Sequence, residues 1–246
     1  FNKKKEKRIK PLYKMRKYAG ATIDNLTSNF LGTSYSANSE ISTGLDRLRA
    51  RSRDLAENND YAKRYLAMVK SNIVGENGIT MQARSKRTDG TLDEQDNELL
   101  EKEFASWGES EWCSADGRKS WIDIQKLCAE TIARDGEVLL RYIRNAKNPW
   151  GVSLHVMEAD YLDTKLNKIT GNAKQVVMGI EIDSYGRPVA YHLSENYPDA
   201  LGGLGTLRKN IEIIPASDLV HVYEQDRPEQ VRGVPWMHTA IRRLNM

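Results

Sequence analysis

Apolar residues in the first third of the chain recur at the spacing of a helix. One such stripe, at i, i+3, i+4, i+7 and i+11, consists of Ala62, Tyr65, Leu66, Val69 and Ile73. This spacing is typical of a helix that buries one face. The polar run Asn58-Asn59-Asp60 interrupts the region and offers a helix cap. We therefore expect two helices, or one kinked helix, between residues 45 and 73.

A second helical region is predicted between residues 91 and 135. Thr91 precedes Glu94 by three residues, which is the spacing of a reciprocal helix cap. The apolar positions that follow it at helical spacing are Leu100, Phe104 and Trp107. A second capped start and its buried stripe consist of Ser120, Asp123, Ile124, Leu127, Cys128 and Thr131. We interpret Cys128 as a small core residue of this helix.

Beyond Gly136 the apolar period shortens to two, which is typical of strands. The alternating positions are Val138, Leu140 and Tyr142, then Val152, Leu154 and Val156, and then Ile180, Ile182, Val189, Tyr191 and Leu193. Residues 183–186 fit the turn of a hairpin, and residues 219–223 fit one more strand. A short strand is also expected at 79–83, and a closing helix from Pro235. The fold class is therefore α+β, with helices first, an antiparallel or mixed β-rich half next, and a helix at the end.

Composition indicates a folded chain with an unevenly charged start. The chain has 246 residues, of which 39% are hydrophobic, and a formal net charge of +3. The basic positions near the start include Lys3, Lys4, Lys5, Lys7 and Arg8. We divide the chain into a basic arm and extended connector, residues 1–44, and an α+β body, residues 45–246. The arm is either a solvated tail or a contact for DNA phosphates or shell protein.

The ends and the apolar runs add two expectations. The chain begins at Phe1, and Met246 falls inside the helix expected from Pro235, so we expect a fragment of a longer protein. No uninterrupted apolar run has the length of a membrane span, and we expect no membrane partner.

Candidate catalytic groups are few. The histidines His155, His192, His221 and His238 are far apart in the sequence, and we interpret them as structural. Three acids, Glu158, Asp160 and Asp163, have a spacing that a metal-dependent nuclease could use, although acids at strand ends are more often backbone caps. The glycines of 202–205 lack the order of a phosphate loop. We expect no catalytic residue, no metal ligand and no cofactor.

Five short motifs carry a family resemblance. They are Leu48-Arg49-Ala50-Arg51-Ser52-Arg53-Asp54-Leu55, Asn72-Ile73-Val74-Gly75, Asp135-Gly136-Glu137-Val138, Gly186-Arg187-Pro188-Val189-Ala190-Tyr191-His192 and Arg232-Gly233-Val234-Pro235-Trp236. In this order the chain resembles the amino-terminal part of portal proteins of lambda-like phages and prophages.

The resemblance implies a structural subunit and no enzyme. In that family twelve copies form a ring at one capsid vertex, through which double-stranded DNA is packaged and ejected. The implied partners are the other portal subunits, the terminase large subunit, and the capsid and head-completion proteins. The implied location is the virion, with assembly in the host cytoplasm. The channel helices of the family would be missing from this chain.

Two segments are candidate subunit interfaces. The first is the arginine segment with Arg49, Arg51 and Arg53, which could pair with carboxylates of a neighbouring subunit or form a solvated face. The second contains Arg232, Gly233 and Pro235, where Gly233 would allow a backbone turn and Pro235 would begin a helix. The alternatives from other classes are a metal-dependent nuclease and a DNA-binding protein of a mobile element.

Overall fold

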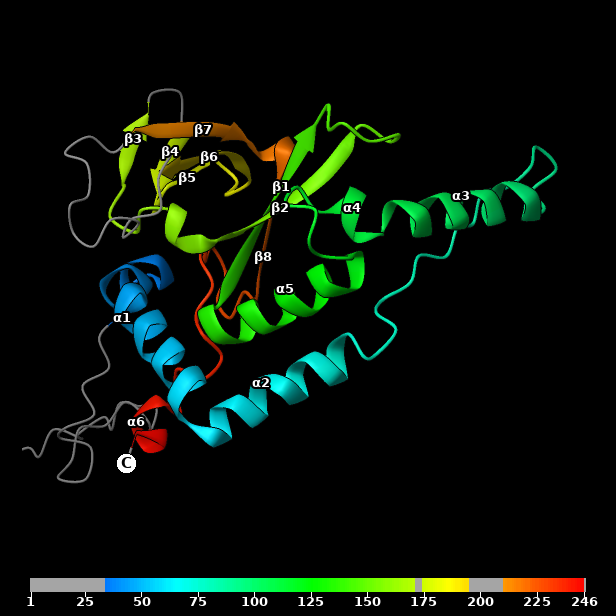
Figure 1. Cartoon of the computed structure of the whole chain (residues 1–246). Coiled ribbons are helices and arrows are strands. Elements are labelled where there is room, and N and C mark those ends of the chain that lie inside the picture. Colours follow the sequence, from blue (N-terminus) through cyan, green and yellow to red (C-terminus); the bar gives the residue numbers. More distant parts are fainter. Residues whose placement is uncertain (1–33, 171–173, 195–209, 246) are drawn as a thin grey trace, which may run out of the picture. The chain divides into compact units, whose positions relative to one another are not determined.

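The structure is a computed structural model that describes residues 34–170, 174–194 and 210–245. The chain divides into two units, and the description below concerns the second, residues 36–246. In this unit helices come first, two antiparallel sheets follow, and a short helix closes the described chain (Figure 1). The predicted α+β fold class is confirmed.

The first two helices are α1 (Ala37–Asn58) and α2 (Asp60–Ile73). Asn59 separates them, and its side chain accepts a hydrogen bond from the backbone N of Ala62 at 3.1 Å. The predicted interruption is therefore confirmed. The expected extended connector is wrong over residues 37–44, which are helical. Ser36 caps α1 by accepting a hydrogen bond from Ser39 N, so the helix begins within the segment expected to be extended.

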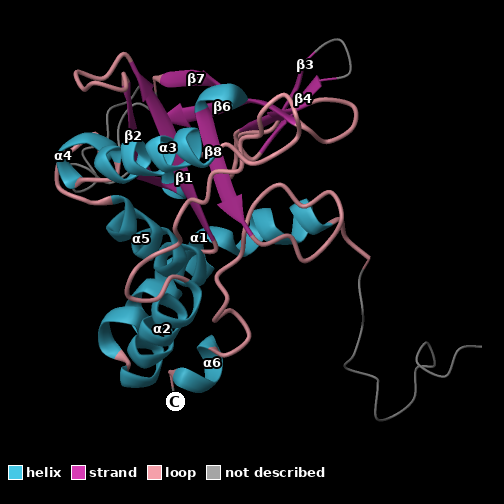
Figure 2. Cartoon of the chain, turned by 90° about the vertical axis from the view of Figure 1, so that its right-hand side faces the viewer, coloured by secondary structure: helices cyan, strands magenta, loops and turns pink. Residues whose placement is uncertain are grey.

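The next helices are α3 (Glu94–Trp107), α4 (Ser110–Cys113) and α5 (Trp121–Asp135). Ser120 and Asp123 form the predicted reciprocal cap of α5. The predicted cap at Thr91 is wrong, because Asp93 caps α3 and Thr91 instead donates its hydroxyl to Asp89 at 2.6 Å. Within the layers, α5 lies along the three-stranded sheet and α2 packs on the other side of α5 (Figure 2).

The strands form two sheets. The first has the order β2-β1-β8 and consists of β1 (Glu137–Arg144), β2 (Val152–Glu158) and β8 (Leu219–Tyr223). The second has the order of the sequence and consists of β3 (Lys168–Thr170), β4 (Lys174–Val177), β5 (Ile180–Ile182), β6 (Pro188–Ser194) and β7 (Ile211–Pro215). Short 3-10 turns, η2 (Ala159–Tyr161) and η3 (Ala216–Asp218), follow β2 and β7. The predicted hairpin is confirmed as β5 and β6.

The strand expected at residues 79–83 does not form. The side-chain amide of Gln125 pairs with the Ile79 backbone instead, accepting from its N at 2.6 Å and donating to its O at 3.0 Å. A side chain of α5 therefore takes the place of a neighbouring strand, and Ile79 stays 61% exposed.

The closing helix α6 (Ile241–Leu244) begins later than predicted. Residues 236–240 form turns, in which His238 N donates to Pro235 O at 2.9 Å and Ala240 N donates to Met237 O at 2.8 Å. Trp236 N donates to Ala133 O at 3.1 Å, and this long-range bond holds the segment against the end of α5.

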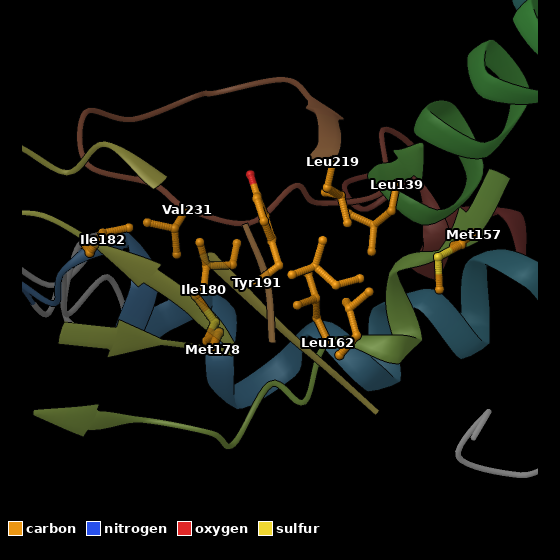
Figure 3. Packing of buried hydrophobic residues seen from close by; sticks show 11 residues of the cluster. Leu139, Met157, Leu162, Met178, Ile180, Ile182, Tyr191, Leu219 and Val231 are labelled. Carbon is orange, nitrogen blue, oxygen red and sulfur yellow. The ribbon is translucent and has the colours of Figure 1, made fainter. Parts of the chain in front are cut away.

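The largest hydrophobic core joins the two sheets. Side chains from β1 and β2 meet side chains from the second sheet and its connections (Figure 3). The labelled members are Leu139, Met157, Leu162, Met178, Ile180, Ile182, Tyr191, Leu219 and Val231. A second cluster packs α5 on the first sheet, and Cys128 lies against it as predicted. Burial raises the pKa of the Cys128 thiol to about 12.

Candidate functional site

A carboxylate with no solvent exposure lies where α5 passes into β1. It belongs to Glu137, the first residue of the strand. Arg232 donates to it from Nε at 2.8 Å and pairs with it through Nη2 at 2.7 Å. Arg49 of α1 contacts the same oxygen, Oε1. The other oxygen, Oε2, accepts from Gly233 N at 2.9 Å and lies 2.8 Å from Nε2 of His221.

Arg49 joins α1 to the rest of this cluster. Its side chain is 2% exposed, its Nε donates to the backbone O of Asp135 at 3.1 Å, and its Nη1 donates to Asp160 at 3.2 Å. Because α5, β1 and the turn after β2 each supply an acceptor, a single guanidinium fixes the position of α1 against three other elements.

Arg232 joins the second sheet to the same carboxylate. It is fully buried, and its Nη1 donates to Met178 O, between β4 and β5, at 2.8 Å. Its Nη2 donates to Ala159 O at 3.1 Å. A planar guanidinium presents donors in several directions, so it can satisfy a carboxylate and two carbonyls at once.

The charges of the cluster are set by these contacts. Burial alone would raise the pKa of Glu137, but the Arg232 and Arg49 guanidinium groups and His221 hold it well below its ordinary value. Burial lowers the pKa of His221, and the two arginines add to this against the opposite effect of Glu137. The glutamate is therefore ionised and the histidine neutral. A carboxylate only accepts hydrogen bonds, so the His221 proton is assigned to Nε2.

Further ion pairs lie beside the buried cluster. Arg53 of α1 lies 3.0 Å from Asp135 and 2.6 Å from Asp160, with Glu158 at 3.4 Å. Arg134 pairs with Asp135 at 3.0 Å. In these pairs each arginine lies next to carboxylates, so the positive and negative charges beside the cluster balance one another.

Two glycines allow the backbones to cross beside Glu137. A Cβ on Gly233 would lie 2.0 Å from Gly136 O, and a Cβ on Gly136 would lie 2.4 Å from the backbone C of Val234. Gly136 also has a positive φ of 91°. Gly233 does not, so the predicted reason for that glycine is wrong: close approach of two backbones requires it, not a turn. Pro235 is buried and precedes turns, not a helix.

The structure brings most of the predicted interface residues together. Arg49, Arg53, Arg232 and Gly233 all lie in or beside the cluster, and the partners of Arg49 and Arg53 are carboxylates of the same chain. Arg51 lies on the opposite side of α1, exposed, beside a groove that Ile241 and Arg242 also line. A subunit boundary at these segments stays a prediction. The basic arm, with Lys3, Lys4, Lys5, Lys7 and Arg8, lies outside the described residues, as do the glycines of 202–205.

The acids considered for a nuclease are held by other groups. Asp160 pairs with Arg49 and Arg53, Glu158 pairs with Arg53, and Asp163 accepts from Lys165 N at 2.9 Å. Among the residues that the structure describes, no group of three or more His, Cys, Asp or Glu side chains could hold a metal ion. The described helices also include none that is long and apolar enough to cross a membrane.

The residue at the centre, Glu137, was not among the predicted site residues. An acid at the start of a strand is ordinarily solvated, and the motif that contains Glu137 has no arginine of its own. The sequence offered one signal: the motifs at 48–55 and 232–236 contain arginines, and the motif at 135–138 contains acids. The motifs alone do not show that these side chains are in contact. His221 was interpreted as structural, and its burial beside Glu137 agrees with that.

Comparisons with known proteins agree with the resemblance. The family model described as phage portal protein, lambda family, matches residues 24–246. A protein named probable portal protein, from Halomonas phage phiHAP-1, is 36% identical over 200 residues. The match covers 81% of this chain and 38% of that protein, so the chain spans well under half the length of this relative.

Proposed function

We infer the function from one premise, that the chain belongs to the lambda family of phage portal proteins. We propose that it is the supporting body of a portal subunit and performs no catalysis. Copies of the complete subunit would assemble into a ring, twelve in the family, at one capsid vertex. Double-stranded DNA would pass through this ring during packaging and ejection.

The observation that best supports a mechanical role is the buried cluster around Glu137. It joins α1, the start of β1, β8 and the segment at Arg232, which are far apart in the sequence. Such contacts are directional, and breaking one leaves a charge buried without a partner. Sliding of α1 over the sheets would break several of these contacts together. A ring that keeps a passage of constant width needs subunits that resist such sliding.

The proposed partners follow from this role. They are neighbouring portal subunits, the terminase large subunit, capsid and head-completion proteins, and the DNA in the passage. We propose the virion vertex as the final location and the host cytoplasm as the place of assembly. The basic arm would contact either DNA phosphates or shell protein.

Ring assembly by the complete subunit tests this proposal. We expect native mass spectrometry and electron microscopy to show rings for the wild type. Gly233→Val should abolish them, because a side chain there collides with the Gly136 backbone. Gly44→Ala is the matched control, because no atom lies within 4 Å of the added Cβ. A wild-type subunit that remains monomeric, or rings unchanged by Gly233→Val, would contradict the proposal.

A further inference from the structure

The outer face of α2 exposes a stripe of large apolar side chains. Tyr61, Tyr65 and Met68 are 79%, 36% and 49% exposed, and they lie at i, i+4 and i+7. They therefore form one stripe along the helix. The adjacent side of the helix, with Leu66 and Val69, is buried in contact with α5 and its neighbours. Tyrosine and methionine are enriched where proteins bind one another, so this outer face is a candidate interface.

A second exposed apolar surface, the leucine stripe, lies at the start of α3 and consists of Leu99 and Leu100 in the helix and Leu92, two residues before it. Leu92, Leu99 and Leu100 are 53%, 57% and 50% exposed. The other end of the helix is packed, since Phe104 and Trp107 stack against Trp121. The apolar face of α3 thus continues beyond the part of the fold that covers it.

The two helices carry opposite charges. α3 contains five acidic residues and one lysine, a net charge of −4, whereas α2 contains three basic residues and one acid, a net charge of +2. Asp96 precedes Leu99 and Leu100 by three and four residues, so it lies on their side of α3, and Arg64 precedes Met68 by four residues on α2. Among the described residues, Arg64 forms no ion pair, and Asp96 forms no direct ion pair but, together with Asp93, raises the pKa of the nearby Arg87 guanidinium.

The two stripes cannot meet within one chain without breaking other contacts. The Trp107 indole donates to Val152 O at 2.9 Å, so the packed end of α3 is attached to β2. Gln125 holds the connecting segment at Ile79. In Figure 1, α3 runs away from α2 from this attachment. The two stripes therefore do not pair with each other within one copy of the described chain.

We propose that the leucine stripe of α3 in one subunit packs on the tyrosine and methionine stripe of α2 in the next, with Asp96 facing Arg64. This inference rests on the proposed function, because a contact between two different surfaces repeats around a closed ring. The apolar side chains supply the buried area. The charges select the neighbour and the register.

A charge exchange in the complete subunit tests the contact. We expect Arg64→Glu and Asp96→Arg each to weaken ring assembly about tenfold or more in native mass spectrometry across a dilution series. The two changes together should restore assembly to within about threefold of the wild type, since the pair is then reversed. Leu99→Asp should weaken assembly similarly.

The controls separate binding from folding. All three positions are exposed, so the circular dichroism spectra should match that of the wild type. Asp96→Arg removes an acid from the first turn of α3, so its melting temperature should fall by only a few degrees. Tyr185→Asp changes a side chain that is 94% exposed on the β5–β6 turn and should leave assembly unchanged.

Different outcomes separate the two proposals. Rings that are indifferent to both charge changes, or single variants that the exchange does not restore, would overturn the contact alone. Cross-linking of these stripes to a different capsid protein, while rings stay intact, would do the same. A wild-type subunit that forms no rings would overturn the proposed function and this contact with it.

Discussion

At the scale of single residues, Glu137 is the position on which the fold depends most. Its carboxylate is fully buried yet ionised, because Arg49, Arg232 and Gly233 N surround it. The arginines are themselves buried, at 2% and 0% exposure. Removing the central charge would therefore leave two guanidinium groups inside the fold without their main partner.

Glu137→Gln is expected to lower the free energy of unfolding by about 3–5 kcal/mol, because glutamine keeps the shape but not the charge. Urea denaturation measures this change. Glu94→Gln, at an exposed position of α3, should stay within about 0.5 kcal/mol of the wild type. A Glu137→Gln protein as stable as its parent would show that the cluster does not stabilise the fold.

The stability should also depend on pH through His221. Its pKa is lowered from 6.5 in the folded state, so below about pH 6.5 the unfolded chain takes up a proton that the folded chain does not. The free energy of unfolding therefore falls as the pH drops, by at most about 1.4 kcal/mol per pH unit for this group. His221→Gln should flatten the decline between pH 7 and 5. Part of the slope remains, because burial lowers the pKa of His155 too. An unchanged slope would contradict the assignment of a neutral His221.

At the scale of elements, the crossing of the α5–β1 junction with the segment at Gly233 determines how closely the layers pack. Gly233→Ala should lower the free energy of unfolding by about 3 kcal/mol or more, since the added Cβ overlaps the Gly136 carbonyl. Gly44→Ala, inside α1 with open space around it, should instead raise stability by about 0.5–1 kcal/mol. Thermal unfolding of both variants gives the comparison. A Gly233→Ala protein as stable as the wild type would contradict the close approach of the two backbones.

The helices should differ in local stability. The amino-terminal half of α3 buries little beyond Asn97, whereas α5 buries residues along its whole length. Hydrogen exchange measured by mass spectrometry is therefore expected to be fast over residues 94–100 and slow over residues 124–133. If ring formation covers α3 as proposed, exchange over 94–100 should slow in the assembled ring. Equal protection of both segments in the monomer would contradict this description.

Most elements could be predicted from the sequence, because their signals are local. The break at Asn59, the cap at Ser120 and the hairpin at Asp183 depend on residues within one turn of each other. The wrong predictions concern segments controlled by distant groups. Gln125 pairs with the backbone of Ile79 in place of a strand, and Ala133 O accepts from Trp236 N, which holds the segment before the last helix against α5. The spacing of apolar residues along the sequence does not indicate such long-range contacts.

At the scale of the whole molecule, the residues of the site could be recognised in the sequence, but their contact with one another could not. Three of the five motifs supply Arg49, Glu137 and Arg232, and the two arginines contact the buried carboxylate of Glu137. The fold class and family could be inferred from pattern and motif order. The convergence could not, because it depends on how two sheets and a helical layer pack.

The most direct test of this account is an electron cryomicroscopy structure of the complete subunit in its assembled form. We expect a ring in which Arg49 and Arg232 of every subunit contact Glu137 of the same chain, so that each body is internally braced. A ring in which Arg49 pairs instead with a carboxylate of the neighbouring subunit, or an assembled form that is not a ring, would contradict it.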